Sequence, residues 1–289
     1  TPHDSLSARP TVVIVGSGFG GLFAARALAK TDADVVLIAK TSHHLFQPLL
    51  YQVATGILSQ GEIAPSTREV LASQKNATVV LGEVTDIDLA SRTLTAQLIG
   101  REETFTQHYD QLIVAAGATQ SWFGHDEFAI HAPGMKSIDD ALELRGRIFG
   151  AYEFAEVAAR EGRPDEVADL MTFVVVGAGP TGVEMAGQLV ELSKRTLRHD
   201  FRHIKPGDAR IVLLDAAPAV LGSFPPSLQG KTKAALERMG VDVRLGAMVT
   251  DVDERGITVR TTGPDGQPRE ERIGAVTKVW AAGVAASPL

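Results

Sequence analysis

The sequence predicts an α/β protein built from two similar halves, each with a parallel sheet and an inserted antiparallel β-meander. Each half opens with a short apolar strand, at Thr11–Val15 and at Thr172–Val176, followed at once by a glycine-rich turn. The turns span 16–21 and 177–182, and the residues after each turn favour a helix. A strand, a turn and a helix in this order are typical of a sheet whose strands are joined by helical crossovers.

Later segments support an internal duplication. Residues 81–88 resemble 245–253, and residues 112–118 match 279–285, in the same order and at nearly the same distance from the first glycine. Alternating apolar and polar residues between these markers predict the short strands of a meander in each half. Because these features recur in one order, we interpret the chain as two copies of one fold.

A predicted helix and a linker join the halves. Residues 138–160 carry apolar side chains along one side, and Ser137 or Asp139 can cap the start of the helix. A linker is expected at 161–169, where Gly162 and Pro164 interrupt the helical pattern.

Composition narrows the classes of function. The hydrophobic fraction of 44% and charged fraction of 22% are those of a globular protein, and the net charge of −7 disfavours nucleic acid as a partner. No apolar run is long enough to span a membrane, and Thr1–Pro10 lacks the apolar core of a signal peptide. The absence of cysteine excludes disulfides, thiolate nucleophiles and iron–sulfur clusters held by this chain. Redox chemistry would therefore need a bound cofactor.

The two glycine turns are predicted to bind dinucleotides. The first glycine of such a turn makes a tight bend, the second lets the backbone approach a pyrophosphate, and the third lets the helix pack on the strand. The helix N-terminus offers free N–H groups and a partial positive charge to the phosphates. The alternative is an ordinary glycine-rich turn, but the flanking strand and helix favour a nucleotide site. The candidate binding residues are Gly16, Ser17, Gly18, Phe19, Gly20 and Gly21 in the first turn, and Gly177, Gly179, Pro180, Thr181 and Gly182 in the second.

An acidic residue that ends the next strand would hold a ribose hydroxyl. In the second half this residue is Asp215, and because no arginine follows it, NADH is favoured over NADPH. Asp215 could instead be an ordinary residue at a strand end. In the first half the same position is Ala39, followed by Lys40. Whether Lys40 contacts the ribose or phosphate oxygens, or is simply solvated, stays open.

The chain resembles the type II NADH:quinone oxidoreductases, a family of two-dinucleotide-binding flavoproteins. The resemblance is most specific in the first turn, in residues 43–56, in residues 177–186 and in residues 279–288. It implies two Rossmann-like domains that bind FAD and NADH, with hydride transfer from NADH to FAD. Electrons would then pass to a membrane quinone, menaquinone or ubiquinone, without proton pumping.

The resemblance also implies a domain layout and further contact residues. The FAD-binding domain is expected at 1–136, the connecting helix and linker at 137–169, the NADH-binding domain at 170–277, and a return strand at 278–289. Small residues after the final strand of each half let a ligand approach closely. The implied cofactor contacts outside the turns are Val84, Ala116, Gly117, Ala282 and Gly283, together with Pro48 and Leu49. The last two lie in an apolar segment that could alternatively be a core-packing loop.

Glu184 is the candidate for chemistry. It lies in the first turn of the second helix, where the helix dipole alone favours a carboxylate. A carboxylate beside a nicotinamide could also orient the ring or relay a proton toward the quinone. The histidine pairs His43–His44 and His199–His203 lack the partners of a metal site, so no metal is expected. The second pair is expected to be solvated.

In the resembled family more chain follows, including a Gly-Asp pair at the flavin and a C-terminal region that docks on the membrane. We therefore expect the protein, cut at Leu289, to hold FAD weakly, to turn over quinone poorly and to be soluble. The full-length protein would be peripheral, on the cytoplasmic side of the cell membrane, and a homodimer is left open. Two alternatives remain. One is an NADH-dependent reductase of a ferredoxin or rubredoxin, and the other is a nucleotide sensor without turnover.

Overall fold

The computed structural model describes residues 9–289, so most of the N-terminal stretch considered above lies outside the described residues. The chain divides into two compact units. The first unit holds the residues up to Gln47, Gln60–Thr119 and Ala286–Leu289. The second unit holds Pro48–Ser59 and Gln120–Ala285. Among the described residues, no helix is long and apolar enough to cross a membrane.

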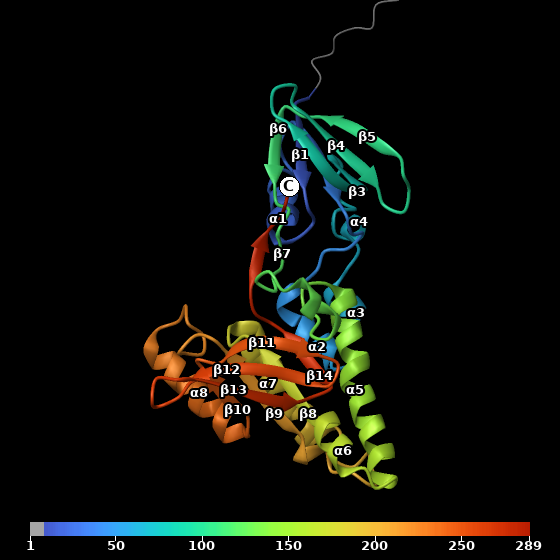
Figure 1. The fold of residues 1–289 in the computed structure, drawn as a ribbon. Coiled ribbons are helices and arrows are strands. Elements are labelled where there is room, and N and C mark those ends of the chain that lie inside the picture. The colour runs from blue at the N-terminus through green and yellow to red at the C-terminus, as the bar shows by residue number, and fades with distance from the viewer. Residues whose placement is uncertain (1–8) are drawn as a thin grey trace, which may run out of the picture. The chain divides into compact units, whose positions relative to one another are not determined.

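The first unit is built on a six-stranded sheet with the order β5-β4-β3-β2-β1-β6 (Figure 1). β6, β1, β2 and the start of β3 are parallel, whereas β3, β4 and β5 form an antiparallel meander. The strands are β1 (Thr11–Val15), β2 (Asp34–Ala39), β3 (Ala77–Asp88), β4 (Thr93–Leu98), β5 (Thr104–His108) and β6 (Gln111–Val114). The helices are α1 (Phe19–Ala27), α3 (Gln60–Ile63) and α4 (Thr67–Val70).

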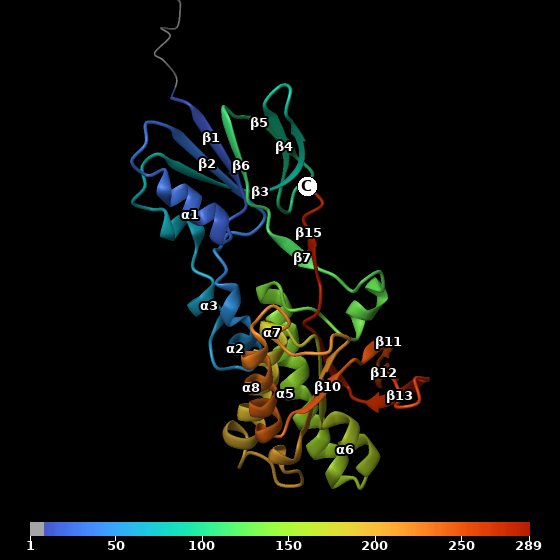
Figure 2. The same ribbon diagram turned by 90° about the vertical axis from the view of Figure 1, so that its left-hand side faces the viewer.

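Strand β1 of the first unit is buried on both faces, as is usual for parallel strands. Val12 and Ile14 of β1 belong to the core beneath α1, which covers one face of the sheet (Figure 2). Val13 and Val15 point the other way and belong to the core beneath the meander. The unit therefore has three layers, namely helix, parallel sheet and meander.

The second unit repeats this arrangement. Its parallel sheet has the order β10-β9-β8-β14, which corresponds to β3-β2-β1-β6, and its meander has the order β11-β12-β13. The strands are β8 (Thr172–Val176), β9 (Arg210–Asp215), β10 (Asp242–Leu245), β11 (Met248–Asp253), β12 (Gly256–Thr262), β13 (Pro268–Gly274) and β14 (Thr277–Trp280). The helices are α2 (Leu50–Ala54), α5 (Ile138–Arg160), α6 (Pro164–Leu170), α7 (Pro180–Glu191) and α8 (Pro226–Met239). The short strands β7 (Ala118–Gln120) and β15 (Val284–Ala286) pair with each other and contain the residues where the chain passes between units.

The structure confirms the predicted duplication down to one irregularity. The register of each meander shifts at the same place, between Val84 and Asp86 in the first unit and between Val249 and Asp251 in the second. In each unit the extra residue is a threonine whose hydroxyl donates to a carbonyl on the facing strand. Thr85 donates to the Thr95 carbonyl and Thr250 donates to the Thr258 carbonyl, each over 3.4 Å. A bulge bends its strand and increases the local twist, and in both units it lies a few residues beyond the last pairing with the parallel sheet.

The helix predicted at 138–160 is confirmed, and the segment after it is largely helical as well. α5 runs over Ile138–Arg160, and Ser137 and Asp140 cap it reciprocally, because the Ser137 hydroxyl accepts the Asp140 N–H while the Asp140 carboxylate accepts the Ser137 N–H. In place of the expected linker at 161–169, the structure has α6 packed against α5. The proline at position 164 starts this helix, because a proline is tolerated at the first helical position.

The segment at 197–208 is fastened to α5 through one carboxylate. Glu156 accepts backbone N–H groups of Arg202, His203 and Ile204 and also bonds the His203 ring at 2.7 Å. Desolvation raises the pKa of the Glu156 carboxyl, but these hydrogen bonds together outweigh it and lower the pKa to about 2. His203 is exposed, as expected of a solvated residue, but its ring and its backbone also bind Glu156.

A buried lysine ties the second meander to its sheet. Lys278 on β14 is fully buried, and its ammonium donates to the carbonyls of Asp253, Glu254 and Ala275 at 2.8, 3.0 and 2.9 Å. Burial lowers the pKa of Lys278 to about 8. All three donors of the ammonium are thus used, two of them at the turn between β11 and β12 and the third at the residue after β13.

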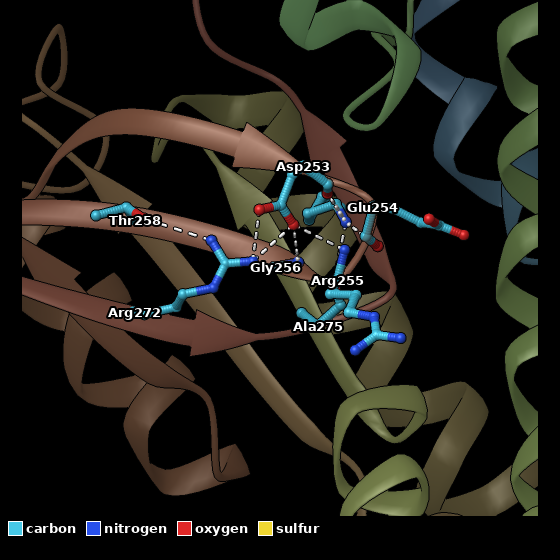
Figure 3. A network of polar contacts seen from close by, with 8 residues as sticks. Asp253, Glu254, Arg255, Gly256, Thr258, Arg272 and Ala275 are labelled. Carbon is cyan, nitrogen blue, oxygen red and sulfur yellow. Dashed lines mark hydrogen bonds and ion pairs between the residues drawn. The ribbon is translucent and has the colours of Figure 1, made fainter.

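The same turn is held differently in the first unit. Asp253 and Asp88 each accept two backbone N–H groups of their own turn. Asp253 also pairs with Arg272 of β13 (Figure 3). The Asp88 carbonyl accepts a hydrogen bond from the Tyr109 hydroxyl at 3.4 Å, whereas the equivalent Asp253 carbonyl accepts one from the Lys278 ammonium. The two units therefore share the accepting carbonyl at this turn and differ in the side chain that donates to it.

We expect Lys278→Met to lower the free energy of unfolding by about 2–3 kcal/mol, because it leaves buried carbonyls without a donor. Chemical denaturation of the chain measures this. Lys233→Met is the control, since Lys233 is a half-buried residue of α8 paired with Glu237 and should cost about 0.5 kcal/mol. Equal losses in the two variants would contradict the role of Lys278.

The low pKa of Lys278 predicts a pH dependence of stability. The pKa is about 8 in the folded chain, against 10.5 for the ordinary side chain, so both states hold the proton below pH 8. Between these values the unfolded chain binds more protons, and the contribution of Lys278 to folding becomes more favourable as pH rises. The free energy of unfolding of the unmodified chain, relative to Lys278→Met, should rise there by up to about 1.4 kcal/mol per pH unit. A flat or falling difference would refute this.

Candidate dinucleotide-binding sites

The first glycine turn is fixed by contacts that allow no side chain. Gly16 has a φ of +101°, and a Cβ on it would lie 2.3 Å from the carbonyl oxygen of Ala115. A Cβ on Gly21 would lie 1.8 Å from the carbonyl oxygen of Gly16. The middle glycine differs, because no described atom outside its immediate chain neighbours lies within 4 Å of a Cβ built on Gly18. The turn therefore presents open backbone at Gly18, between two crowded glycines.

The second turn repeats this geometry. Gly177 has a φ of +105°, and a Cβ on it would lie 2.6 Å from the backbone nitrogen of Ala282. A Cβ on Gly182 would lie 1.7 Å from the carbonyl oxygen of Gly177, whereas one on Gly179 would meet no described atom within 4 Å. Each helix begins inside its turn, earlier than the sequence predicts, because the third glycine lies in the first helical turn.

A cavity of about 520 Å³ adjoins the first turn, within the range of small-molecule sites. It lies at the carboxyl ends of the parallel strands, where ligands of such sheets bind. Seven predicted contact residues line it, namely Gly16, Ser17, Gly18, Lys40, Val84, Ala116 and Gly117. Sequence reasoning missed Glu83, Thr85 and Thr119, which also line it. Thr85 lies at the repeated bulge, which only the strand register reveals, and bulges often adjoin functional sites.

Five contacts predicted for the first half do not line this cavity, namely Phe19, Gly20 and Gly21 at the start of α1, and Pro48 and Leu49. Pro48 and Leu49 belong to the second unit, whereas every residue lining the cavity belongs to the first. The apolar segment that contains them is partly helical, and α2 packs against α5 and α7. Leu50, Val53 and Ala54 of α2 are buried there.

The segment after β2 contacts the first turn. The Ser17 hydroxyl donates to the His43 carbonyl at 3.1 Å, and Nδ1 of His44 lies 2.9 Å from the Ser17 carbonyl. The Phe19 ring meets the rings of His44 and Phe46 edge-on, with centroids 5.3 and 5.5 Å apart. Sequence reasoning missed these contacts, because they join residues far apart in the chain.

Asp215 contacts the second turn directly. One of its carboxylate oxygens accepts the Ala178 N–H at 2.6 Å, and the other accepts the Ala217 N–H at 2.7 Å. The carboxylate is therefore oriented before any ligand binds, and each oxygen keeps a lone pair for a hydroxyl. The nearby return segment is held by Gln120, whose amide donates to the carbonyls of Ala282 and Gly283 at 2.5 and 2.8 Å.

Glu184 is exposed and lies just beyond the first turn of α7, not in it as expected, because the helix begins at Pro180. Desolvation by the surrounding protein raises the pKa of its carboxyl. A carboxyl with a raised pKa is suited to binding and releasing a proton closer to neutral pH. The structure thus places Glu184 on the same helix as the second glycine turn.

Two equivalent glycine turns, each at the carboxyl ends of a parallel sheet with an inserted meander, define a two-dinucleotide-binding α/β protein. The sequence profile of the pyridine nucleotide-disulphide oxidoreductase family matches residues 10–289, and the chain belongs to this family.

Comparison with known proteins confirms the resemblance inferred from the sequence. The chain is 60% identical over 289 residues to the type II NADH:quinone oxidoreductase NdhA of Mycobacterium tuberculosis, covering 99% of this chain and 59% of that protein. It is 58% identical to Ndh of the same organism, covering 100% of this chain and 61% of that protein. The structure of NDH2 from Plasmodium falciparum in complex with NADH matches with a TM-score of 0.86 at 24% identity, over 96% of this chain and 56% of that one. The chain thus spans about three-fifths of the length of these relatives.

The second and third glycines of the second turn should respond differently to a methyl group. Gly182→Ala should destabilise the chain and abolish NADH binding, because the new Cβ overlaps the carbonyl of Gly177. Gly179→Ala should leave the thermal midpoint unchanged and weaken NADH binding by about tenfold or more, because its methyl occupies only the space for the pyrophosphate. Calorimetric titration and thermal melting measure both effects. Unchanged NADH affinity in a well-folded Gly179→Ala variant would refute this assignment.

Proposed function

We propose that the chain is the nucleotide-binding part of an FAD-dependent NADH:quinone oxidoreductase. The observation that carries the proposal is the pair of equivalent glycine turns, each with a crowded first and third glycine and an open second glycine. In this proposal the first unit binds FAD and the second binds NADH. The M. tuberculosis relatives are named for NADH and quinone, which supports the same pair of substrates here.

The residues at the first turn fit an FAD pyrophosphate. The open backbone at Gly18 and the start of α1 offer N–H groups to phosphate oxygens, and the cavity beside them is large enough for part of a dinucleotide. Lys40, on the wall of this cavity, adds a positive charge that attracts phosphates. Bound FAD would supply the hydride-accepting and electron-transferring chemistry that the cysteine-free chain lacks.

The residues at the second turn fit NADH better than NADPH. The carboxylate of Asp215 is held against the turn by the Ala178 N–H, so it is placed to accept ribose hydroxyls. A phosphate on that ribose would meet this carboxylate without a compensating cation, because Ala216, Ala217 and Pro218 follow. Ala282 and Gly283, held by Gln120, keep the space near Gly177 free of large side chains.

The proposed electron acceptor is a quinone, and the reduction of quinone is proposed for the full-length protein. Because quinones of respiratory chains are dissolved in the bilayer, an enzyme that reduces them must reach the membrane surface. We infer peripheral attachment on the cytoplasmic side, through regions beyond the three-fifths of the relatives that this chain spans.

A reductive titration tests the proposed function. The chain is reconstituted with FAD and titrated without oxygen, and we expect NADH to bleach the flavin absorbance while NADPH does so much more slowly. Addition of menaquinone should restore the flavin absorbance, and addition of ferredoxin or rubredoxin should not. Flavin that stays oxidised with NADH would point to a nucleotide sensor and overturn the proposal.

Glu184 is proposed to hold a proton beside the nicotinamide. If so, the rate of flavin reduction by NADH should show an ionisation above the ordinary carboxyl pKa of 4.5, because desolvation raises the pKa of Glu184. Glu184→Gln should remove this ionisation from the pH profile and slow the reaction by about 10²-fold. Glu191→Gln, on the last turn of the same helix, is the matched control. An unchanged pH profile in Glu184→Gln would rule out the role.

A further inference from the structure

The acid of the second unit has a structural task besides any contact with ribose. Gly177 donates its N–H to the carbonyl of Leu214 at 2.7 Å, which places the end of β9 beside the turn. The next residue of β9, Asp215, accepts the N–H of Ala178 at 2.6 Å. The residue after the first glycine is therefore fixed by the carboxylate that ends the neighbouring strand.

The first unit has the same framework without this carboxylate. Gly16 donates its N–H to the carbonyl of Ile38 at 2.8 Å, so Ile38 corresponds to Leu214 and Ala39 corresponds to Asp215. Ser17 corresponds to Ala178. An alanine offers no side-chain acceptor, so the carboxylate contact of the second unit cannot form at Ser17.

Ser17 is held instead by two hydrogen bonds to the next segment of chain. Its hydroxyl donates to the His43 carbonyl at 3.1 Å, and its carbonyl lies 2.9 Å from Nδ1 of His44. Because a carbonyl can only accept, Nδ1 of His44 carries the hydrogen and donates it. Ser17 is 6% exposed and His44 is 8% exposed, so both bonds are shielded from water.

The segment that provides these bonds is itself anchored. The His44 N–H donates to the Pro65 carbonyl at 2.9 Å, and the Thr67 N–H donates to the Ser42 carbonyl at 3.0 Å. The edge-on contact with Phe19 holds the His44 ring on its other side. His44 is thus held in place both by the hydrogen bond of its backbone and by the contact of its ring with Phe19.

We propose that His44 is a positioning residue for the dinucleotide of the first unit, and that the His43–His44 segment does the structural work of the missing acid. The proposal rests on the proposed function in assigning FAD to this turn. A turn held by His44 keeps the backbone at Ser17 and Gly18 in the conformation that accepts a pyrophosphate. Loss of the hydrogen bond from His44 lets the turn become less ordered. FAD must then order the turn when it binds, which weakens its affinity.

The test compares His44→Ala with His43→Ala in the full chain. His43→Ala is the matched control, because Ser17 uses only the backbone carbonyl of His43. Hydrogen–deuterium exchange over 16–21 should quicken by about tenfold in His44→Ala, which is the effect expected for one lost buried hydrogen bond. It should stay unchanged in His43→Ala. The dissociation constant for FAD, followed by flavin fluorescence, should rise about tenfold in the first variant alone.

Two further variants keep the test decisive. His44→Asn retains a donor near the position of Nδ1 and should behave like the unmodified chain, which covers the case in which the alanine variant fails to fold. Ala39→Asp in the His44→Ala background places a carboxylate where the second unit has Asp215, and it should restore slow exchange and FAD affinity. Affinity of the second turn for NADH should stay constant throughout.

Unchanged exchange of the turn in His44→Ala, or an equal change in His43→Ala, would overturn the inference. Failure of the proposed function looks different, because the unmodified chain would then show no FAD binding. The exchange measurement needs no FAD and still decides whether His44 holds the turn.

Discussion

The structure depends on the close approach of a helix to the strand before it, at two equivalent places. The backbone of the third glycine lies against the carbonyl of the first, where a Cβ would be only 1.8 Å away in the first unit and 1.7 Å away in the second. No other residue can take this position without moving the helix outward. The start of α1 or α7 reaches the carboxyl end of the sheet only because that side chain is missing, and the free N–H groups of the helix lie there.

The two units show which features the fold requires and which it can exchange. Strand order, the bulge in the meander and the aspartate that caps the following turn are the same in both. The donor that fastens this turn is a tyrosine hydroxyl in one unit and a buried ammonium in the other. A hydrogen bond to the carbonyl of Asp88 or Asp253 is needed in either case, and its chemical source is free to vary. Because the tyrosine is neutral, only the second unit carries the desolvation cost of a buried charge.

Features set by local chemistry were predictable from the sequence. The strands Thr11–Val15 and Thr172–Val176, the glycine turns and the capped helix α5 follow from apolar runs, backbone freedom and capping groups within a few residues. Features set by distant contacts were not. Lys278 reads as an ordinary cation, and only the folded chain brings three carbonyls to it. The helix α2 follows a strand of the first unit but packs in the second, which periodicity over a short segment does not indicate.

The missing acid at Ala39 is the clearest case of a sequence signal that the structure reinterprets. An acid at the end of the second strand has two separable tasks, fixing the residue after the first glycine and accepting hydroxyls of a ribose. Asp215 has the geometry for both, because each of its oxygens accepts one backbone N–H and keeps a lone pair. In the first unit the fixing contact comes from His43 and His44, so position 39 no longer needs a carboxylate for it. With no carboxylate at position 39, the neighbouring Lys40 is the charged group that the end of this strand brings to the cavity. A cation there favours phosphate over ribose hydroxyls, so the two units differ in the part of a dinucleotide that the end of the strand is suited to contact.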